Sequence, residues 1–338
     1  MLNGKSLSEV IDLLDIHFNI QELAEIAIEV DPRQMTREKA RDYVHAGVSR
    51  VSLGVQDFNE QTQKAINRVQ PFSMIENTVS WFREAGIRSI NFDLIYGLPF
   101  QTVATVADNV KKAVSLAPDR VAVFGYAHVP WMRPHQKILE RYPMPNVLER
   151  YRQAEHMREV FLENGYRSVG MDHFARPDDS LAKALDSGTL KRNFQGYTTD
   201  GFDELMGLGI SSISKHPDAY IQNTTSYKVY KEKLNQGILP VERGCQLSAE
   251  DKVRATIIEK LMCYFEVDVA KTCKAQSFPD AELLEKIPAL QPMERDGLVT
   301  IEGSCVKVTN TGRPFVRSIC SVFDSYFQQM ENRHARAI

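Results

Sequence analysis

Apolar and polar positions alternate along the first part of the chain in a pattern that predicts strands and helices in turn. Short apolar runs, typical of buried strands, lie at 25–30, 50–56, 88–95 and 120–126. Segments that predict helices lie at 6–17, from Arg37 to Gly47, at 74–85 and at 104–117. This alternation predicts parallel strands joined by right-handed crossovers, in either a barrel or an open sheet.

Polar residues stand where these strands end. Glu29, Gln56 and Asp93 close or interrupt the first three runs, and Ala127 follows the fourth. Since polar side chains at the carboxyl ends of parallel barrel strands face the active site, this arrangement predicts an enzyme with a polar ligand. Asp93 is the strongest of these positions, because an unpaired carboxylate within an apolar run is costly. The structural alternative is a buried ion pair between Asp93 and Arg68 or another arginine.

The middle of the chain predicts one strong helix and then a loop. The helix is expected at 147–164, and the polar stretch at 170–199 is expected to be irregular. His173 in that stretch could carry a proton or could be a hydrogen-bonded structural residue. The glycine-rich run Met206-Gly207-Leu208-Gly209-Ile210 is weak evidence for a phosphate loop and better suits a close approach of the backbone to a ligand.

The last part of the chain, from Gln246, predicts a winged-helix-like domain. Its expected elements are helices at 249–265, near 279–290 and at 311–330, and a hairpin around Gly303. A winged helix suggests DNA binding, but this part holds 12 lysines and arginines against 13 aspartates and glutamates, a net charge of -1. That balance gives little attraction for phosphates, so we expect packing rather than nucleic-acid binding.

Composition narrows the class of protein further. The chain has 338 residues, 43% hydrophobic and 25% charged, and a net charge of -3, which suits one large or two medium domains without a basic surface for nucleic acid. We expect no membrane span and no signal peptide, and therefore a cytoplasmic protein. The five cysteines are widely spaced, none at the spacing of a metal site, and most are expected to be reduced core residues. No metal ligand is predicted, and the pattern identifies no catalytic residue.

Several motifs resemble one enzyme family over nearly the whole chain, the C-terminal part included. They are Ile28-Glu29-Val30-Asp31-Pro32, Gly54-Val55-Gln56-Asp57-Phe58, Asn67-Arg68, Asn91-Phe92-Asp93-Leu94-Ile95-Tyr96-Gly97-Leu98-Pro99, Tyr126-Ala127-His128, Gly170-Met171-Asp172-His173-Phe174-Ala175-Arg176-Pro177 and Asn193-Phe194-Gln195-Gly196-Tyr197-Thr198-Thr199. The family is the radical S-adenosylmethionine (SAM) enzymes of the oxygen-independent coproporphyrinogen III oxidase type. The related haem-chaperone branch shares the first motifs, but it usually has Ser at the place of Asp57 and lacks Gln-Gly-Tyr-Thr-Thr.

The resemblance implies an α/β fold, a radical SAM (β/α)6 barrel followed by the winged-helix-like domain, with domains at 1–245 and 246–338. It implies a [4Fe–4S] cluster, two SAM molecules and oxidative decarboxylation of two propionates of coproporphyrinogen III to vinyl groups, which gives protoporphyrinogen IX in haem biosynthesis. An electron-donor protein is the expected partner, and the full-length family is expected to be monomeric. By motif, Glu29 and Ile213 would contact the cluster-bound SAM. Those that would contact the second SAM are Gln56, Arg68, Asp93 and Ala127.

This chain departs from the family in one respect. The family's Cys-x3-Cys-x2-Cys loop and Gly-Gly-Gly-Thr-Pro segment are absent, so we expect an incomplete barrel that lacks its first two strands. The strand at 25–30 would then form an exposed edge. We expect no cluster and no activity from this chain alone. The alternative function is a non-catalytic porphyrin- or haem-binding protein related to the haem-chaperone branch, and a winged-helix regulator is the third hypothesis.

Overall fold

The computed structural model describes residues 3–18, 20 and 25–327. The chain forms two compact units that meet in the sequence between Asp186 and Ser187.

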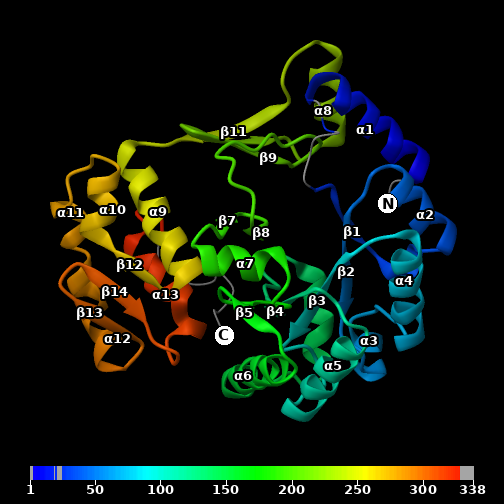
Figure 1. The fold of residues 1–338 in the computed structure, drawn as a ribbon, viewed down its shortest axis with the longest axis horizontal. Helices are drawn as coiled ribbons and strands as arrows, with labels where there is room; N and C mark the ends of the chain where they lie inside the picture. Colours follow the sequence, from blue (N-terminus) through cyan, green and yellow to red (C-terminus); the bar gives the residue numbers. More distant parts are fainter. Residues whose placement is uncertain (1–2, 19, 21–24, 328–338) are drawn as a thin grey trace. The chain divides into compact units, whose positions relative to one another are not determined.

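The first unit is built on a six-stranded sheet with the order β1-β2-β3-β4-β6-β5 (Figure 1). Its strands are β1 (Ala27–Val30), β2 (Arg50–Gln56), β3 (Ser89–Tyr96), β4 (Arg120–Gly125), β5 (Arg167–Val169) and β6 (His173–Ala175). The first four are parallel neighbours, as the sequence predicts, whereas β6 runs antiparallel to both β4 and β5. The prediction of an irregular stretch from residue 170 was therefore wrong at β6, which joins the main sheet.

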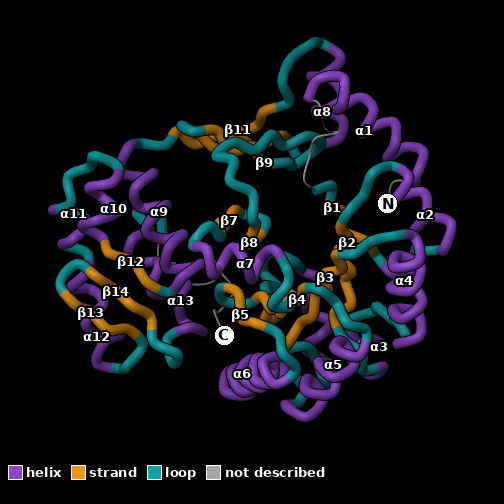
Figure 2. Tube along the Cα trace, in the orientation of Figure 1, coloured by secondary structure: helices purple, strands orange, loops and turns teal. Residues whose placement is uncertain are grey.

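Five helices of this unit occur where the sequence analysis predicts them, whereas the short helices at 60–65 and 180–187 were not predicted, and the second of these lies in the stretch that was expected to be irregular. The helices are α1 (Gly4–Phe18), α2 (Arg37–His45), α3 (Glu60–Ala65), α4 (Phe72–Ala85), α5 (Val103–Ser115), α6 (Val147–Glu163) and α7 (Ser180–Ser187), with short 3-10 helices η2 (Pro32–Gln34) and η3 (Pro134–Arg141). Figures 1 and 2 show α2, α4 and α5 along the outer side of the sheet. Capping residues set their ends: Thr36 and Thr102 accept hydrogen bonds at the starts of α2 and α5, and Gly86 ends α4 with φ +109°.

The two faces of the sheet differ in polarity. Ile90, Phe92 and Leu94 of β3 are completely buried in the core formed with the helices. Asn91 and Asp93 alternate with them and so point to the opposite face. Burial of each large apolar side chain contributes about 1.5–3 kcal/mol, which holds β3 in this register.

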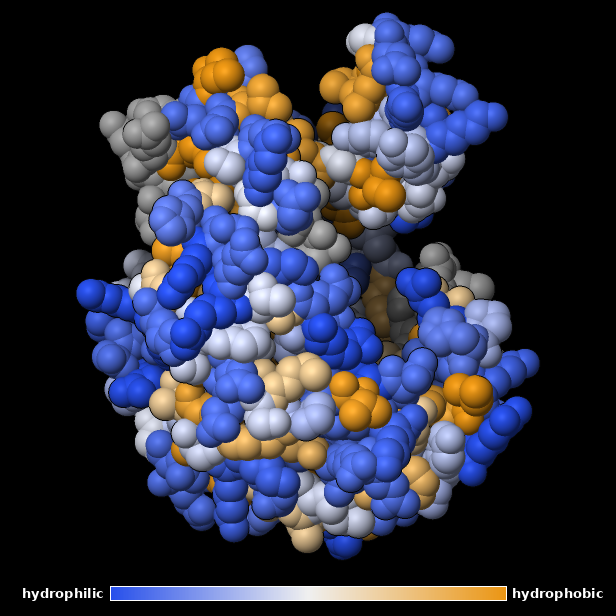
Figure 3. Space-filling model, turned by 90° about the vertical axis from the view of Figure 1, so that its right-hand side faces the viewer, coloured by the Kyte–Doolittle hydropathy of each residue, from blue (hydrophilic) through white to orange (hydrophobic). Residues whose placement is uncertain are grey.

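The apolar stripe of α1 packs less completely than its periodicity suggests. Leu7 lies against the core, but Leu13 and Ile16 are 62% and 73% exposed. Figure 3 shows the face of the molecule that carries the right-hand helices of Figure 1; hydrophilic residues predominate there, with separate apolar residues between them. In the six-stranded sheet of this unit, β1 pairs with β2 alone among the described strands. It therefore lies at the edge of the sheet, where the sequence analysis predicts an edge strand.

The second unit begins with small antiparallel elements that the sequence analysis did not predict. A hairpin of β7 (Lys191–Asn193) and β8 (Gly196–Thr198) is followed by a sheet of β9 (Ile213–His216), β10 (Ala219–Asn223) and β11 (Val241–Gln246), with α8 (Tyr227–Asn235) between the last two. These strands are short and largely polar, as in Lys191–Asn193 and Val241–Gln246, so they contain no apolar run that would reveal them.

The remainder of the second unit combines helices with a three-stranded sheet, as the winged-helix-like prediction requires. Its main elements are α9 (Ala249–Tyr264), β12 (Glu266–Asp268), α10 (Val269–Ala275), α11 (Ala281–Leu284), η4 (Ile287–Leu290), α12 (Gln291–Arg295), β13 (Val299–Glu302), β14 (Cys305–Val308), η5 (Arg313–Phe315), α13 (Val316–Cys320) and η6 (Ser321–Phe323). A capping box of Ser248 and Asp251 starts α9, and β13 and β14 form the expected hairpin.

Two helix predictions in this part were too long. The helix expected near 279–290 is split into α11 and η4, because Pro288 cannot continue the hydrogen-bonding pattern. In place of a helix at 311–330, α13 covers five residues between two 3-10 turns, and residues 328–330 lie outside the described part. Within the described residues, no helix combines the length and apolar character needed to cross a membrane.

Candidate functional site

Strand register brings several of the predicted site residues onto one face of the sheet. Glu29 is paired with Ser52 on the neighbouring strand, and Ser52 is paired with Asn91. Two residues further along β3, Asp93 lies between Gly54 of β2 and Ala122 of β4. Directly paired residues of neighbouring strands point to the same face. Glu29, Ser52, Asn91 and Asp93 therefore form a polar face opposite the helix-covered core.

Asp93 is held by neutral donors rather than by an arginine. Ser52 Oγ donates to Asp93 Oδ2 at 3.1 Å, and Asn91 Nδ2 donates to Asp93 Oδ1 at 2.9 Å and to Ser52 Oγ at 2.8 Å. Burial raises the pKa of Asp93, the two donors oppose this, and the charge of Glu29 raises it further. The alternative of a buried Asp93–Arg68 ion pair is not borne out, because the salt bridge of Arg68 is made with Asp31 at 3.7 Å.

Arg68 and Gln56 meet above Gly54, at the end of β2. Arg68 Nη2 donates to Gly54 O at 3.0 Å, and Gln70 Nε2 donates to the carbonyl oxygens of Gly54 and Val55 at 3.0 and 2.8 Å. Gln56 has φ +68°, in the left-handed region that favours glycine, and its backbone lies at an irregularity in the β2–β3 register. A Cβ atom on Gly54 would lie 2.7 Å from Gln56 Nε2, so this glycine keeps space for the two side chains.

A buried carboxylate fixes the loop that follows Gln56. Asp57 is 0% exposed and accepts hydrogen bonds from Gln101 Nε2 at 2.5 Å, from Asn109 Nδ2 at 2.6 Å and from the backbone N–H of Asn59. Burial raises the pKa of Asp57, and these donors oppose the rise. Asp57 thus ties the end of β2 to α5 and to the loop before it.

Ala127 lies two residues beyond β4, in a loop supported from two sides. Gln136 Nε2 donates to Ala127 O at 3.1 Å, and Arg150 Nη2 of α6 donates to the neighbouring Tyr126 O at 2.9 Å. Gln56 and this loop both lie at the carboxyl ends of parallel strands, which face one edge of the sheet. Ile213, in contrast, is the first residue of β9 in the second unit.

His173 also belongs to the polar face of the sheet. It pairs in register with Ala122, which pairs with Asp93, so the two titratable side chains flank a small alanine. His173 Nδ1 lies 2.7 Å from Asp172 Oδ1, and its ring meets Phe124 edge-on at 6.0 Å. Since an ionised carboxylate only accepts hydrogen bonds, Asp172 selects the form of His173 that carries a proton on Nδ1.

Sequence reasoning missed Ser52 and Asn91. Both could have been found from the two-residue period of a strand, because Asn91 is two positions before Asp93 and Ser52 alternates with the apolar Val51 and Leu53. It also missed the donors around Asp57, for which the sequence carries no local sign.

The cysteines do not form a cluster site in the part of the chain that the structure describes. Cys263, Cys273 and Cys320 are buried, as expected for core residues, whereas Cys305 is half-buried and Cys245 is exposed. No group of three or more His, Cys, Asp or Glu residues that could hold a metal occurs among the described residues. These side chains therefore do not fit a [4Fe–4S] cluster.

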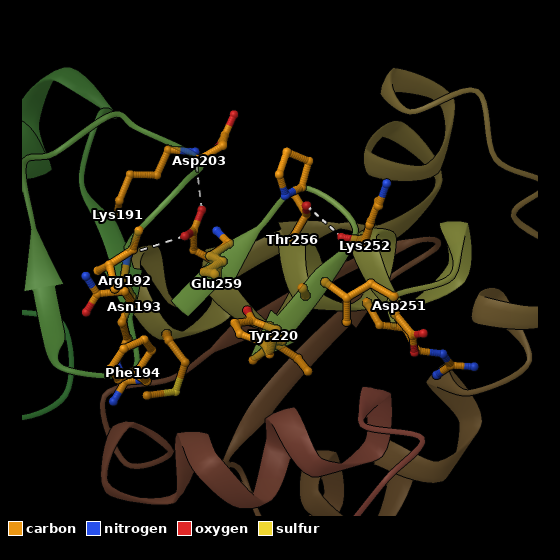
Figure 4. A pocket seen from close by; sticks show the side chains of 18 of the residues that line it. Lys191, Arg192, Asn193, Phe194, Asp203, Tyr220, Asp251, Lys252, Thr256 and Glu259 are labelled. Carbon is orange, nitrogen blue, oxygen red and sulfur yellow. Dashed lines mark hydrogen bonds and ion pairs between the residues drawn. The ribbon is translucent and has the colours of Figure 1, made fainter. Parts of the chain in front are cut away.

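The second unit contains a cavity of about 790 Å³. Figure 4 shows it between β7, α9 and Tyr220 of β10. Glu259 of α9 lies 3.5 Å from Lys191 Nζ and accepts from the backbone N–H of Arg192 at 3.3 Å. Lysines, arginines, aspartates and glutamates line it together, so its charge does not indicate one class of ligand.

Comparison with known proteins assigns the family. Residues 4–113 match the model of the radical SAM superfamily, and residues 247–315 match that of the HemN C-terminal domain. The chain is 40% identical over 334 residues to the oxygen-independent coproporphyrinogen III oxidase of Bradyrhizobium diazoefficiens, covering 99% of this chain and 74% of that protein. It belongs to the oxygen-independent coproporphyrinogen III oxidase family.

Comparison with the oxidase of Escherichia coli supports the same family. The Escherichia coli oxidase is 39% identical over 330 residues, covering 97% of this chain and 72% of that protein. The solved structure of the Escherichia coli enzyme, described as a radical SAM enzyme, superposes with a TM-score of 0.90 at 38% identity, over 96% of this chain and 75% of that one. The chain therefore has the α/β radical SAM fold of the oxidase family together with its C-terminal domain.

Proposed function

We propose that this chain carries the adenosyl- and porphyrinogen-binding part of an oxygen-independent coproporphyrinogen III oxidase. The observation that carries the proposal is the hydrogen-bonded carboxylate of Asp93 on the polar face of a parallel sheet, a face that also carries Glu29. An ionised carboxylate accepts hydrogen bonds from hydroxyl and ammonium groups. SAM supplies hydroxyl groups with its ribose and an ammonium group with its amino-acid part.

The individual roles follow from the donors and acceptors of each side chain. Asp93 would accept from a ribose hydroxyl or from a cationic group, and Arg68 would bind a carboxylate. Gln56 and the backbone of Ala127 would complete the second SAM site, and Glu29 would accept from the first SAM. Ile213 would add an apolar contact to the first SAM. The substrate would be coproporphyrinogen III, with a donor protein for electrons.

The finer architecture is part of the same proposal. Four parallel strands would form part of a (β/α)6 barrel that lacks two strands, and the C-terminal domain would begin at residue 246, within the second compact unit. Because the cysteines of the described chain do not fit a cluster, the chain alone would bind ligands without turning them over. The alternative, a porphyrin- or haem-binding protein without catalysis, rests on the same observation.

Calorimetric titration with SAM, beside spectroscopic titration with haem and with coproporphyrin III, tests the function. Saturable SAM binding together with coproporphyrin binding is the expected result. Haem binding without SAM binding would favour the alternative function. If none of the three ligands binds, both proposals are wrong.

Asp93→Asn is expected to weaken SAM binding by about ten- to a hundredfold, since a hydrogen bond to a charged group contributes about 1.5–3 kcal/mol. The variant should nevertheless fold. Its amide can accept from Asn91 and donate to Ser52 Oγ, so the network of the face survives. The same titration measures the loss, with Asp108→Asn, an exposed side chain of α5, as the control.

The difference in stability between Asp93→Asn and the parent should depend on pH in a defined direction. Burial raises the pKa of Asp93 in the folded chain, so its contribution to stability is fully present below the unfolded pKa, near 3.8. That contribution is lost as the pH rises through the folded pKa. The variant lacks this loss and should therefore gain stability relative to the parent as the pH rises from 3.5 to 7. A constant difference between the denaturant midpoints of the variant and the parent across this range would contradict the raised pKa of Asp93 in the folded chain.

Gly54→Ala tests the space above the end of β2. The new methyl group would lie 2.7 Å from Gln56 Nε2 and 3.0 Å from Arg68 Nη2, which are the mobile ends of long side chains. We expect Gln56 and Arg68 to move, SAM affinity to fall about tenfold or more, and the melting temperature to change little. Unchanged affinity would show that the two side chains do not contact the ligand.

A further inference from the structure

One arginine of the first unit has no carboxylate partner among the residues that the structure describes. Seven arginines between residues 3 and 186 are buried or half-buried. Six of them form salt bridges with a carboxylate: Arg50 with Glu25, Arg68 with Asp31, Arg83 with Asp119, Arg120 with Asp179, Arg158 with Glu155 and Arg167 with Asp186. The seventh, Arg150 of α6, has none among the described residues.

Arg150 lies at the carboxyl ends of β3 and β4. Its Nη2 donates to Tyr126 O at 2.9 Å, and its Nε is buried without a hydrogen-bond partner in the described chain. A Cβ on Gly97 would lie 2.8 Å from Nε, and one on Gly125 would lie 3.3 Å from Nη2. The side chain thus passes over one glycine and ends beside the other, in the loops that follow the two strands.

The hydrogen-bonding capacity of this guanidinium is mostly unused. It has five N–H donors, and one backbone carbonyl accepts from it. A charged group that loses solvent is normally paired, and burial lowers the pKa of Arg150, as expected for a cation without a counter-ion. The backbone contact accounts for the position of the side chain but leaves its charge uncompensated.

We propose that Arg150 binds a carboxylate group of a ligand at this edge of the sheet. The inference rests on the proposed function, under which two ligands carry carboxylates: SAM has one, and coproporphyrinogen III has four propionates. A planar guanidinium is well suited to a carboxylate oxygen in a partly desolvated place. Arg150 would therefore be a binding residue in addition to Gln56, Arg68 and Asp93.

The test separates the charge of Arg150 from its support of the loop. Arg150→Met keeps most of the stem and removes the charge, Arg150→Lys keeps a charge, and Arg158→Met removes a paired arginine of the same helix as the control. Each protein is titrated with SAM and with 5′-methylthioadenosine, which lacks the carboxylate. In a second arm each is titrated with coproporphyrin III and with its tetramethyl ester. Thermal melting confirms that each variant is folded.

The expected result is that Arg150→Met binds one carboxylate ligand about tenfold more weakly, which is about 1.4 kcal/mol. Its affinity for the matching carboxylate-free ligand should stay unchanged, and Arg150→Lys should recover part of the loss. The arm in which the difference occurs identifies the source of the carboxylate.

Two results would overturn the inference while leaving the proposed function intact. In one, Arg150→Met binds all ligands as the parent does. In the other, it loses affinity equally for ligands with and without a carboxylate, which is the behaviour of a purely structural arginine. A parent chain that binds neither SAM nor coproporphyrin III refutes the proposed function and this inference together.

Discussion

Replacing Asp57 by asparagine is expected to lower the free energy of unfolding by about 3 kcal/mol. The orientation of both amides around Asp57 is fixed by other bonds. Gln101 Oε1 accepts from Leu98 N at 2.8 Å while its Nε2 donates to Ile95 O at 2.7 Å, and Asn109 Oδ1 accepts from Phe58 N at 3.0 Å. The new NH2 group would therefore face a donor, and no rotation of Gln101 or Asn109 could relieve it.

Chemical denaturation at neutral pH measures this loss. A matched control is Asp108→Asn, because Asp108 is an exposed aspartate of α5 whose pair with Lys112 spans one helical turn. Exposed pairs of this kind contribute about 0.3–0.5 kcal/mol, so the control should unfold almost as the parent does. Equal midpoints for Asp57→Asn and the parent would mean that Asp57 is not an acceptor of three hydrogen bonds.

Anaerobic reconstitution of this chain with iron and sulfide is expected to leave iron well below four atoms per chain. Cluster ligands must be thiolates, yet burial raises the pKa of Cys263 and of Cys320 to about 12. Burial also raises the pKa of Cys273, and burial and neighbouring acidic groups raise that of Cys305. Cys245 is exposed but cannot hold a cluster by itself.

The measurement is iron and sulfide analysis after desalting, together with a turnover assay with SAM, a reductant and coproporphyrinogen III. No product is expected. The Escherichia coli oxidase, reconstituted in parallel, controls for the procedure. A stoichiometric four-iron cluster on this chain, with an absorption spectrum to match, would contradict the prediction.

The parallel strands could be predicted from the sequence because their cause is local. Each of β2, β3 and β4 is an apolar run long enough to show a period, and a glycine or a proline separates each helix from the next strand. The strands β5 and β6 have three residues each, and their pairing with β4 depends on partners far away in the sequence. Such strands carry no periodic signal.

The residues of the candidate site could likewise be predicted only in part. Glu29, Gln56 and Asp93 could be recognised because a polar residue at the end of an apolar strand is conspicuous. Arg150 could not, because arginine is ordinary on a helix and only its lack of a carboxylate partner within the described part of the chain distinguishes it. The roles of these residues toward a ligand are predictions that the binding experiments address.

The opposite polarity of the two faces of β3 limits how this protein can change in length. Deleting one residue within Ser89–Tyr96 would turn the side chains beyond the deletion over, so that a carboxylate would enter the place of Phe92 or Leu94. Such a register shift of the strand would disrupt the hydrophobic core and the polar face at the same time. Insertions and deletions that survive in natural variants should accordingly fall in segments that connect the elements, and spare the strands.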